Sequence, residues 1–263
     1  MGTIYKHEMK SNLKNLFIWC LSVSIMGFIC ILLFTSVKDS MVGMADSFAS
    51  MGAFSDAFGM DKLSIATLAG FYATEVGTIH GLGGAMFAAI ISVGMLSKEE
   101  DGHTSEFLFS QPISRGKVIT AKLFSVVTNI ILLNVIAVVI YILAIVILGE
   151  DMLMKEFIIF HIMQTIMQLE IGAVCFGISA LMKKNKIGIG LGLVLFLYAY
   201  DLMARVVPDL EDYKVISPFS YANASDIFSG SELAMVALII GAVILTLGVL
   251  MSYIVYQKRD LAT

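Results

Sequence analysis

The residues of this sequence that could do chemistry are a few polar side chains inside long apolar runs. Glu170 is the strongest case, because it lies near the middle of one such run. An ionisable side chain near the centre of a bilayer costs on the order of 2.5–3.5 kcal/mol, so it is kept where it has a partner or a function. Two interpretations of Glu170 stay open: a contact with substrate or protons in a membrane pathway, or a carboxyl group satisfied by neighbouring helices. The candidate pathway residues are Glu170, His161, Gln164, Gln168, Glu75 and His80.

Neither a nucleotide loop nor a metal site is indicated by the motifs. Gly116 and Lys117 are followed by Val118, and Gln111 stands where a Walker A loop would begin with Gly, so the sequence has no such phosphate-binding loop. The glycines at 188, 190 and 192 lie inside an apolar run, where helix packing is the better interpretation. The candidate His and Glu residues show no i, i+4 ligand pair within one helix, so we predict no metal site.

Composition places the chain in a membrane. Of its residues 58% are hydrophobic and 14% are charged, whereas a soluble globular domain carries roughly 25% charged residues and needs that polar surface. The three prolines fall outside the long apolar runs, as expected if those runs are helices. The three cysteines lie inside the runs and are interpreted as small buried apolar residues. A formal charge of −4 without a basic arm gives no indication of nucleic-acid binding.

Six apolar segments are long enough to cross a bilayer, because about 20 helical residues match a hydrocarbon core of about 30 Å. We therefore predict an all-α integral membrane protein with a single transmembrane domain over residues 1–263. The first segment is too long for a signal peptide and lacks a cleavage site, so we expect it to remain as an anchor. The predicted spans are 16–35, 76–96, 125–148, 157–181, 187–207 and 233–256.

The orientation follows from the cationic residues in the connections. With six spans, 12 of the 17 Lys and Arg residues fall on the side of the two termini and five fall on the other. Because cationic loops stay on the cytoplasmic side, we predict that both termini are cytoplasmic and that the protein lies in the cell membrane.

Three stretches lie outside the spans. Residues 2–15 alternate apolar residues with lysines, which predicts an amphipathic helix on the inner membrane surface. Met41, Met44, Phe48 and Met51 recur at helical spacing and predict a second amphipathic helix outside. Residues 209–231 are predicted to form short helices and turns at the outer face.

The loop at 98–117, between the second and third spans, is the most informative of the connections. Pro112 ends any helix near Gln111, and Ser114 can cap the next helix. A helix of about two turns remains, with acidic residues at its start and aromatic residues at Phe107 and Phe109. Aromatic residues flanked by charge often mark a docking surface, and the alternative is that they lie on the membrane interface.

The loop sequence EEDGHTSEFLFSQPISR resembles the pattern E-x-x-G-x-T-x-E-x-L-x-x-x-P-x-x-R of the permease subunits of type 2 ABC exporters, the ABC-2 type. Lys122 after the loop, ISPF at 216–219 and KRDL at 258–261 are also similar to that family. The six spans extend the likeness over the whole chain. It indicates a transporter family and does not specify a cargo.

The resemblance implies six transmembrane helices per subunit, an N-terminal amphipathic interface helix, a cytoplasmic coupling helix and short external re-entrant helices. It also implies partners: a second permease copy or a homologous permease, membrane lipid, and two ABC ATPase subunits that bind ATP and Mg²⁺. This chain would then hold no cofactor and would be no enzyme itself. The residues implied to couple to the ATPase are Glu99, Glu100, Gly102, Thr104, Glu106, Phe107, Leu108, Phe109, Pro112 and Arg115.

Two other classes of function stay open at this point. One is an intramembrane enzyme that uses Glu170 and His161 as acid and base. The other is a membrane scaffold or sensor that transports nothing. For an exporter, the apolar spans with few charges favour an amphiphilic peptide or drug as the cargo.

Overall fold

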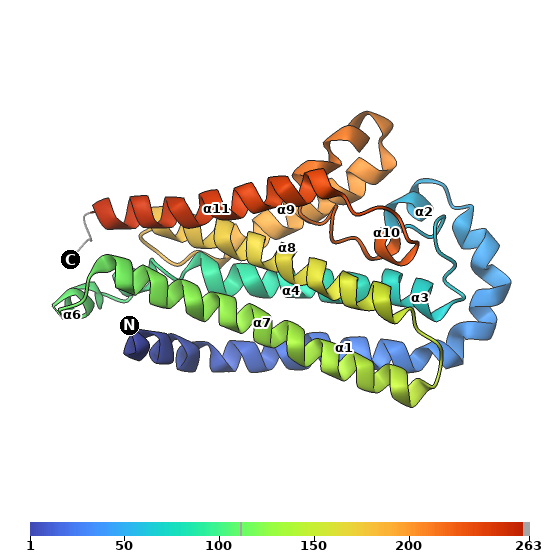
Figure 1. Ribbon diagram of the computed structural model, residues 1–263, viewed down its shortest axis with the longest axis horizontal. Helices are drawn as coiled ribbons and strands as arrows, with labels where there is room; N and C mark the ends of the chain where they lie inside the picture. The colour runs from blue at the N-terminus through green and yellow to red at the C-terminus, as the bar shows by residue number, and fades with distance from the viewer. Residues whose placement is uncertain (111, 260–263) are drawn as a thin grey trace.

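The computed structural model describes residues 1–110 and 112–259, without the side chains of Phe107 and Phe109, and its regular elements in these residues are all helices (Figure 1). The elements are α1 (Gly2–Ala49), α2 (Ala53–Phe58), α3 (Leu68–Phe71), the π-helical turn η1 (Tyr72–Val76), α4 (Gly77–Val93), α5 (Lys98–Asp101), α6 (Ser105–Phe109), α7 (Arg115–Leu148), α8 (Met154–Leu181), α9 (Ile187–Val206), the 3₁₀ segment η2 (Pro208–Ile216), α10 (Ala224–Phe228) and α11 (Met235–Lys258).

Six of the described helical segments are long and apolar enough to cross a membrane, which confirms the predicted number. They are Gly2–Ala49, Leu68–Val93, Arg115–Leu148, Met154–Leu181, Ile187–Val206 and Met235–Lys258. Each contains most of one predicted span. Several run beyond the predicted limits, because a helix continues past the hydrocarbon until a capping residue or a turn stops it.

The first helix differs from the prediction. The expected interface helix at 2–15 and the expected outer helix around Met44 are both parts of α1, which runs unbroken for 48 residues. No proline interrupts this stretch, and Ile4, Glu8, Asn12 and Leu16 form one buried stripe at helical spacing. At 1.5 Å per residue the helix is about 72 Å long, so it extends well past both faces of a 30 Å core. Its last turns bend away at the right of Figure 1.

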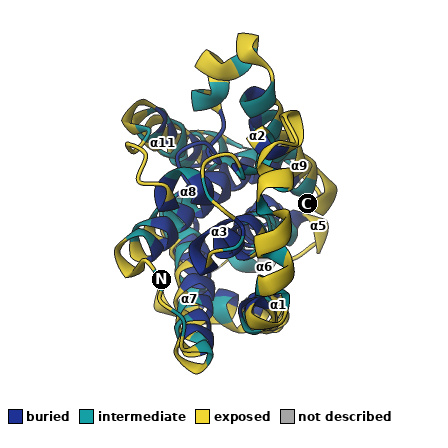
Figure 2. Cartoon of the chain, turned by 90° about the vertical axis from the view of Figure 1, so that its right-hand side faces the viewer, coloured by how far each residue is buried: buried dark blue, intermediate teal, exposed yellow. Residues whose placement is uncertain are grey.

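The bundle is built from two helix pairs with α4 between them. Helix α1 packs along α7, helix α11 packs along α8, and α4 contacts α1, α7, α8 and α9. In the apolar window of the segment that contains α4, 67% of the residues are buried, against 22% in α9 and α11, so α4 is the central helix. Figure 2, which faces the right-hand end of Figure 1, shows the buried residues gathered around α3 and α8 and the exposed ones at the periphery.

Glycines allow a close contact between the backbones of α8 and α11. A methyl group added at Gly177 of α8 would lie 2.7 Å from the carbonyl oxygen of Gly248, and one added at Gly248 of α11 would lie 2.7 Å from that of Ala173. The two backbones can approach this closely only because neither glycine has a side chain. The same approach fixes the position of α11 along α8.

An ion pair joins the first pair of helices at their far end. The Lys38 ammonium of α1 lies 2.7 Å from Oε1 of Glu150, which follows α7. Both side chains are more than 30% exposed, at 39% and 31%, so solvent and salt screen the pair.

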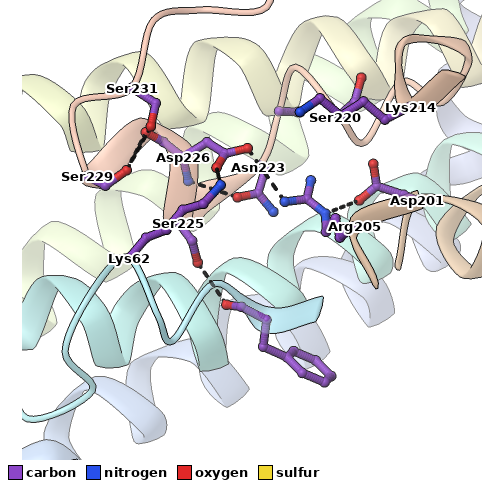
Figure 3. A network of polar contacts seen from close by, with 12 residues as sticks. Lys62, Asp201, Arg205, Lys214, Ser220, Asn223, Ser225, Asp226, Ser229 and Ser231 are labelled. Atoms are coloured by element: carbon purple, nitrogen blue, oxygen red, sulfur yellow. Dashed lines mark hydrogen bonds and ion pairs between the residues drawn. The ribbon is translucent and has the colours of Figure 1, made fainter. Parts of the chain in front are cut away.

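A polar network closes the bundle at the same end as α2, α3 and α10 (Figure 3). Arg205 Nε lies 2.9 Å from Asp201 Oδ2, one helical turn earlier on α9. Arg205 Nη1 lies 3.5 Å from Asp226 Oδ2, and Lys62 Nζ lies 2.7 Å from the other oxygen of Asp226. The network therefore joins α9, α10 and the loop before α3.

The segment between α9 and α11 was predicted to hold short helices, and η2 and α10 confirm this. Residues of η2 are not buried, whereas Ser217, Tyr221 and Ala222 after it return into the bundle. Their entry into the membrane itself stays a prediction.

The arrangement predicts where a reagent can reach the chain. Gly102 and Asp212 are both exposed. Gly102 lies between α5 and α6 at one end of the bundle, and Asp212 belongs to η2, the segment after α9 toward the other end (Figure 1). We expect single cysteines at these two positions, in a variant without the three native cysteines, to react with an impermeant maleimide from opposite sides of sealed vesicles. Reaction of both from one side would contradict the six-span topology.

Candidate functional site

The loop between α4 and α7 folds into two single-turn helices joined by a tight turn. Helix α5 ends at Gly102, and α6 begins after Thr104. His103 between them has φ 52°, a left-handed conformation in which His is found more often than most non-glycine residues. The loop therefore holds two single-turn helices, interrupted at residues 102–104, in place of the predicted helix of about two turns. Ser114 caps α7 through its hydroxyl oxygen, as predicted.

The Lys122 ammonium of α7 lies at the centre of a buried ionic contact. Its nitrogen, Nζ, donates to Glu8 Oε1 at 2.9 Å, to Glu99 Oε1 at 2.5 Å and to the Met95 carbonyl at 2.8 Å. The second oxygen of Glu8 pairs with Lys98. Lys122 is 0% exposed. An ammonium group has three donors, and these three acceptors give each of them a partner inside the protein. Glu99 is thereby joined to α1 and α7.

Glu100 makes a separate contact on the other side of α5. Arg259 Nη2 donates to Glu100 Oε2 at 2.9 Å, and Arg259 Nη1 donates to the Ala180 carbonyl near the end of α8 at 2.8 Å. Arg115 Nη1 donates to the carbonyls of Gln257 at 3.1 Å and Arg259 at 2.6 Å. These carbonyls lie at the end of α11, where no intrahelical donor remains for them. Glu100 is thus joined to α8 and α11.

Helix α6 packs its one described apolar side chain inward. Leu108 is half-buried against the cluster of Ile4 from α1 with Val118 and Ala121 from α7. The side chains of Phe107 and Phe109 lie outside the described residues, so their predicted docking role stays a prediction. The described loop residues that are exposed are Asp101, Gly102, His103, Thr104, Glu106, Ser110, Pro112 and Ser114.

The structure therefore divides the predicted coupling residues into two groups. Glu99, Glu100, Leu108 and Arg115 make contacts inside the chain, whereas Gly102, Thr104, Glu106 and Pro112 face solvent. Sequence reasoning missed Glu8 and the contact that Arg259 makes. A signal for Glu8 was present, because it is the sole acidic residue among the first 38 and lies four residues after the apolar Ile4.

Inside the membrane, Glu170 is buried and has a partner. The Tyr221 hydroxyl donates to Glu170 Oε2 at 2.6 Å, and Gly241 of α11 leaves the space that the carboxyl group fills. Burial, together with the nearby Glu170, raises the pKa of Tyr221, so its hydroxyl keeps the proton that it donates. These contacts support the interpretation of a carboxyl group satisfied by its neighbours.

The two candidate histidines lie side by side in the core. Their rings are 4.7 Å apart between centroids and nearly perpendicular. His161 Nε2 lies 2.8 Å from the Tyr72 hydroxyl, and His80 Nε2 lies 3.0 Å from Asn134 Oδ1. Asn134 in turn donates to Gln168 Oε1 at 2.7 Å. The result is a buried polar chain that joins η1, α4, α7 and α8.

The remaining candidates lie apart from this chain. Gln164 donates to the Ala222 carbonyl at 2.8 Å, and Glu75 is exposed on η1. Glu170 and His161 are nine residues apart on α8, about 13 Å along the axis, and each contacts a different tyrosine. That separation gives no acid and base pair for an intramembrane enzyme. Within the described residues, no group of three His, Cys, Asp or Glu side chains is placed to hold a metal ion.

Comparison with known proteins gives a family for nearly the whole chain. Residues 2–261 match the sequence model of a family described as "ABC-2 family transporter protein". A comparison with curated proteins found no match. The family match covers all six membrane-crossing segments and the loop between α4 and α7.

The Lys122 contact predicts a large effect on stability. Lys122→Met would leave Glu99 and one oxygen of Glu8 buried without a cation, and breaking a buried ion pair in this way costs about 3–5 kcal/mol. Lys98 still contacts Glu8, so we expect about 3 kcal/mol. Thermal unfolding in detergent measures the loss, with Lys117→Met, an exposed lysine on the same helix, as the control. Equal melting temperatures for the two variants would contradict the contact.

The Glu170 contact can be separated from a cargo role by two substitutions. Glu170→Gln keeps an oxygen that accepts from Tyr221, so we expect near wild-type assembly and transport. Tyr221→Phe leaves a buried acceptor unpaired, which lowers the unfolding free energy by about 1–3 kcal/mol. Melting temperature and transport in proteoliposomes report the two effects. Loss of transport in Glu170→Gln at an unchanged melting temperature would identify a cargo contact instead.

Proposed function

The chain belongs to the ABC-2 family of transporter proteins, and from this we propose that it is the membrane-spanning permease subunit of an ATP-driven exporter. The membership confirms the predicted family, and it makes the chain a transport subunit of the membrane and not an enzyme. In the proposal, ATP and Mg²⁺ bind two separate ATPase subunits. Two permeases, identical or homologous, enclose the pathway in the cell membrane.

The exposed turn at residues 101–106 is the observation that supports ATPase binding. It lies at the same end of the bundle as the start of α1 and the end of α11 (Figure 1). That end carries the cationic connections of the chain, and because such connections stay on the cytoplasmic side, our proposal is that this end faces the cytoplasm. Unlike an ordinary loop, this turn is anchored to the helices by Glu99 and Glu100. A force applied to it by a partner would therefore reach the spans.

The charges of the turn indicate what kind of ATPase surface would bind it. Asp101 and Glu106 are exposed and acidic, and His103, which lies between them in the sequence, is exposed too and has a left-handed backbone conformation. A groove with cationic groups at its rim would complement these charges. Such rim charges mainly guide association, whereas a buried aromatic anchor supplies more of the binding energy. Phe107 and Phe109 are the residues that we propose as anchors.

The pathway would lie between two permeases and not within one. The polar candidates His80, His161 and Gln168 contact partners inside a single bundle, so they do not line an open route through it. Helices α9 and α11 present most of their apolar surface outward, where lipid or the second permease can cover it. Alternation of the two permeases between inward-open and outward-open states would then move the cargo. An amphiphilic peptide or drug remains the cargo that we favour.

Association with the ATPase tests the proposal directly. Phe107→Ala combined with Phe109→Ala should weaken binding by about 30-fold or more, because an aromatic anchor contributes about 2 kcal/mol. Glu106→Lys should weaken it less, since a rim charge contributes less. The measurements are co-purification of this chain with a candidate ABC ATPase subunit and the ATP turnover of that subunit in liposomes.

Asp212→Lys is the matched control, because Asp212 is an exposed acidic residue like Glu106 and belongs to η2, far from the loop between α4 and α7. It should bind the ATPase as the wild type does. Unchanged association and unchanged turnover in the Phe107 and Phe109 double variant would remove this loop as the docking point.

A further inference from the structure

Two adjacent acidic residues of the loop make contacts in different directions. Glu99 reaches Lys122 of α7, and Glu100 reaches Arg259 after α11. Neighbouring residues on a helix are separated by about 100° around its axis, so one short helix can present both carboxylates to opposite sides. Helix α5 thereby touches both helix pairs of the bundle at once.

Each contact includes a main-chain group as well as a charge. Lys122 also donates to the Met95 carbonyl, two residues after α4, and Arg259 also donates to the Ala180 carbonyl of α8. A third cation, Arg115 in the first turn of α7, reaches the last carbonyls of α11. The ends of α4, α7, α8 and α11 are therefore joined by side chains to one another and to α5. We call this set the inner clamp, and its members are Glu8, Glu99, Glu100, Arg115, Lys122 and Arg259.

The contacts of the inner clamp are strengthened by the burial of its side chains. The side chains of Lys122 and Glu8 are 0% and 1% exposed, and those of Glu100 and Arg259 are 3% and 10% exposed. Salt screens such pairs much less than it screens exposed ones. In addition, the guanidinium fork of Arg259 contacts Glu100 and Ala180 together, which a single ammonium could not do in the same geometry. Movement of α5 alone would break several of these contacts.

We propose that the inner clamp makes the inner ends of both helix pairs move as one body with the loop, so that Glu99 and Glu100 act inside the permease and not on its partner. Lys122, Arg115 and Arg259 are then positioning residues for force transmission. This inference rests on the proposed function for the source of the force, which is the ATPase bound at the exposed turn. The rigidity itself is a property of the permease alone.

The rigidity can be measured with two spin labels. Lys10 of α1 and Lys258 of α11 are exposed, and they lie on different helix pairs near the inner end. We expect a narrow distance distribution between labels at these positions in the isolated permease in nanodiscs. It should stay unchanged when the ATPase and a non-hydrolysable ATP analogue are added. A large change on nucleotide binding in the wild type would overturn the proposal.

Glu100→Gln tests the link to α11, and Glu106→Gln is the matched control from the exposed part of the same loop. We expect Glu100→Gln to broaden the distribution and to reduce cargo-stimulated ATP turnover about fivefold or more, while the ATPase still co-purifies. Glu106→Gln should keep the narrow distribution. Equal widths in the two variants would overturn the proposal.

Two further variants separate a loss of transmission from a failure to fold. Arg259→Lys keeps the cation but cannot reach both acceptors, so we expect intermediate broadening in a folded protein. Exchange of the charges, with Glu100→Arg and Arg259→Glu together, should narrow the distribution again. The proposal would be overturned if the charge exchange left the label distances as broad as in Glu100→Gln while Arg259→Lys kept the wild-type width of the distance distribution. If the wild type binds no ATPase, the proposed function fails, and the label distances of the isolated permease still decide whether the clamp is rigid.

Discussion

A fully buried ammonium group, that of Lys122, determines how the inner end of the bundle is arranged. A charge in that position must be paired, because the cost of removing an ion from water is several kcal/mol even after relaxation. The three hydrogens of Lys122 are directed at Glu8, Glu99 and the Met95 carbonyl, which come from α1, α5 and the end of α4. The loop can therefore occupy only a position that completes this set. Without it, the turn at residues 101–106 would be an ordinary flexible connection, and a partner bound there would move the turn alone.

The spans and their number could be predicted because the thickness of the hydrocarbon core fixes a minimum length for an apolar run. The continuity of α1 could not, because lysines alternating with apolar residues are equally typical of a helix on the membrane surface. Only the packing of Ile4 against Val118 of α7 decides between the two. The pair of Asp201 and Arg205 was visible from the sequence, since one turn of helix brings such residues together.

The partners of Glu99 and Glu100, in contrast, could not be predicted from the sequence. Glu99 and Glu100 read as solvent-exposed charges, whereas their partners lie 23 and 159 residues away in the chain. The same holds for the membrane candidates, because His161 contacts Tyr72 over 89 residues and Glu170 contacts Tyr221 over 51. Local spacing identifies that a polar residue in an apolar run needs a partner. The helix that supplies the partner follows from tertiary packing, which no local pattern contains.

The ion pair between Lys38 and Glu150 has a consequence for the axial register of α1. Together with the contact between Glu8 and Lys122, it fixes α1 to α7 near both ends. A slide of α1 by one turn, about 5.4 Å, would separate both pairs at the same time, so the two helices keep a single alignment. The two ends nevertheless respond differently to ionic strength, because the outer pair is partly exposed and the inner one is not. A higher ionic strength would therefore weaken the contact of α1 at Lys38 and leave the contact at Glu8 in place, so that the Glu8 contact alone would then hold the register of α1 through an ion pair.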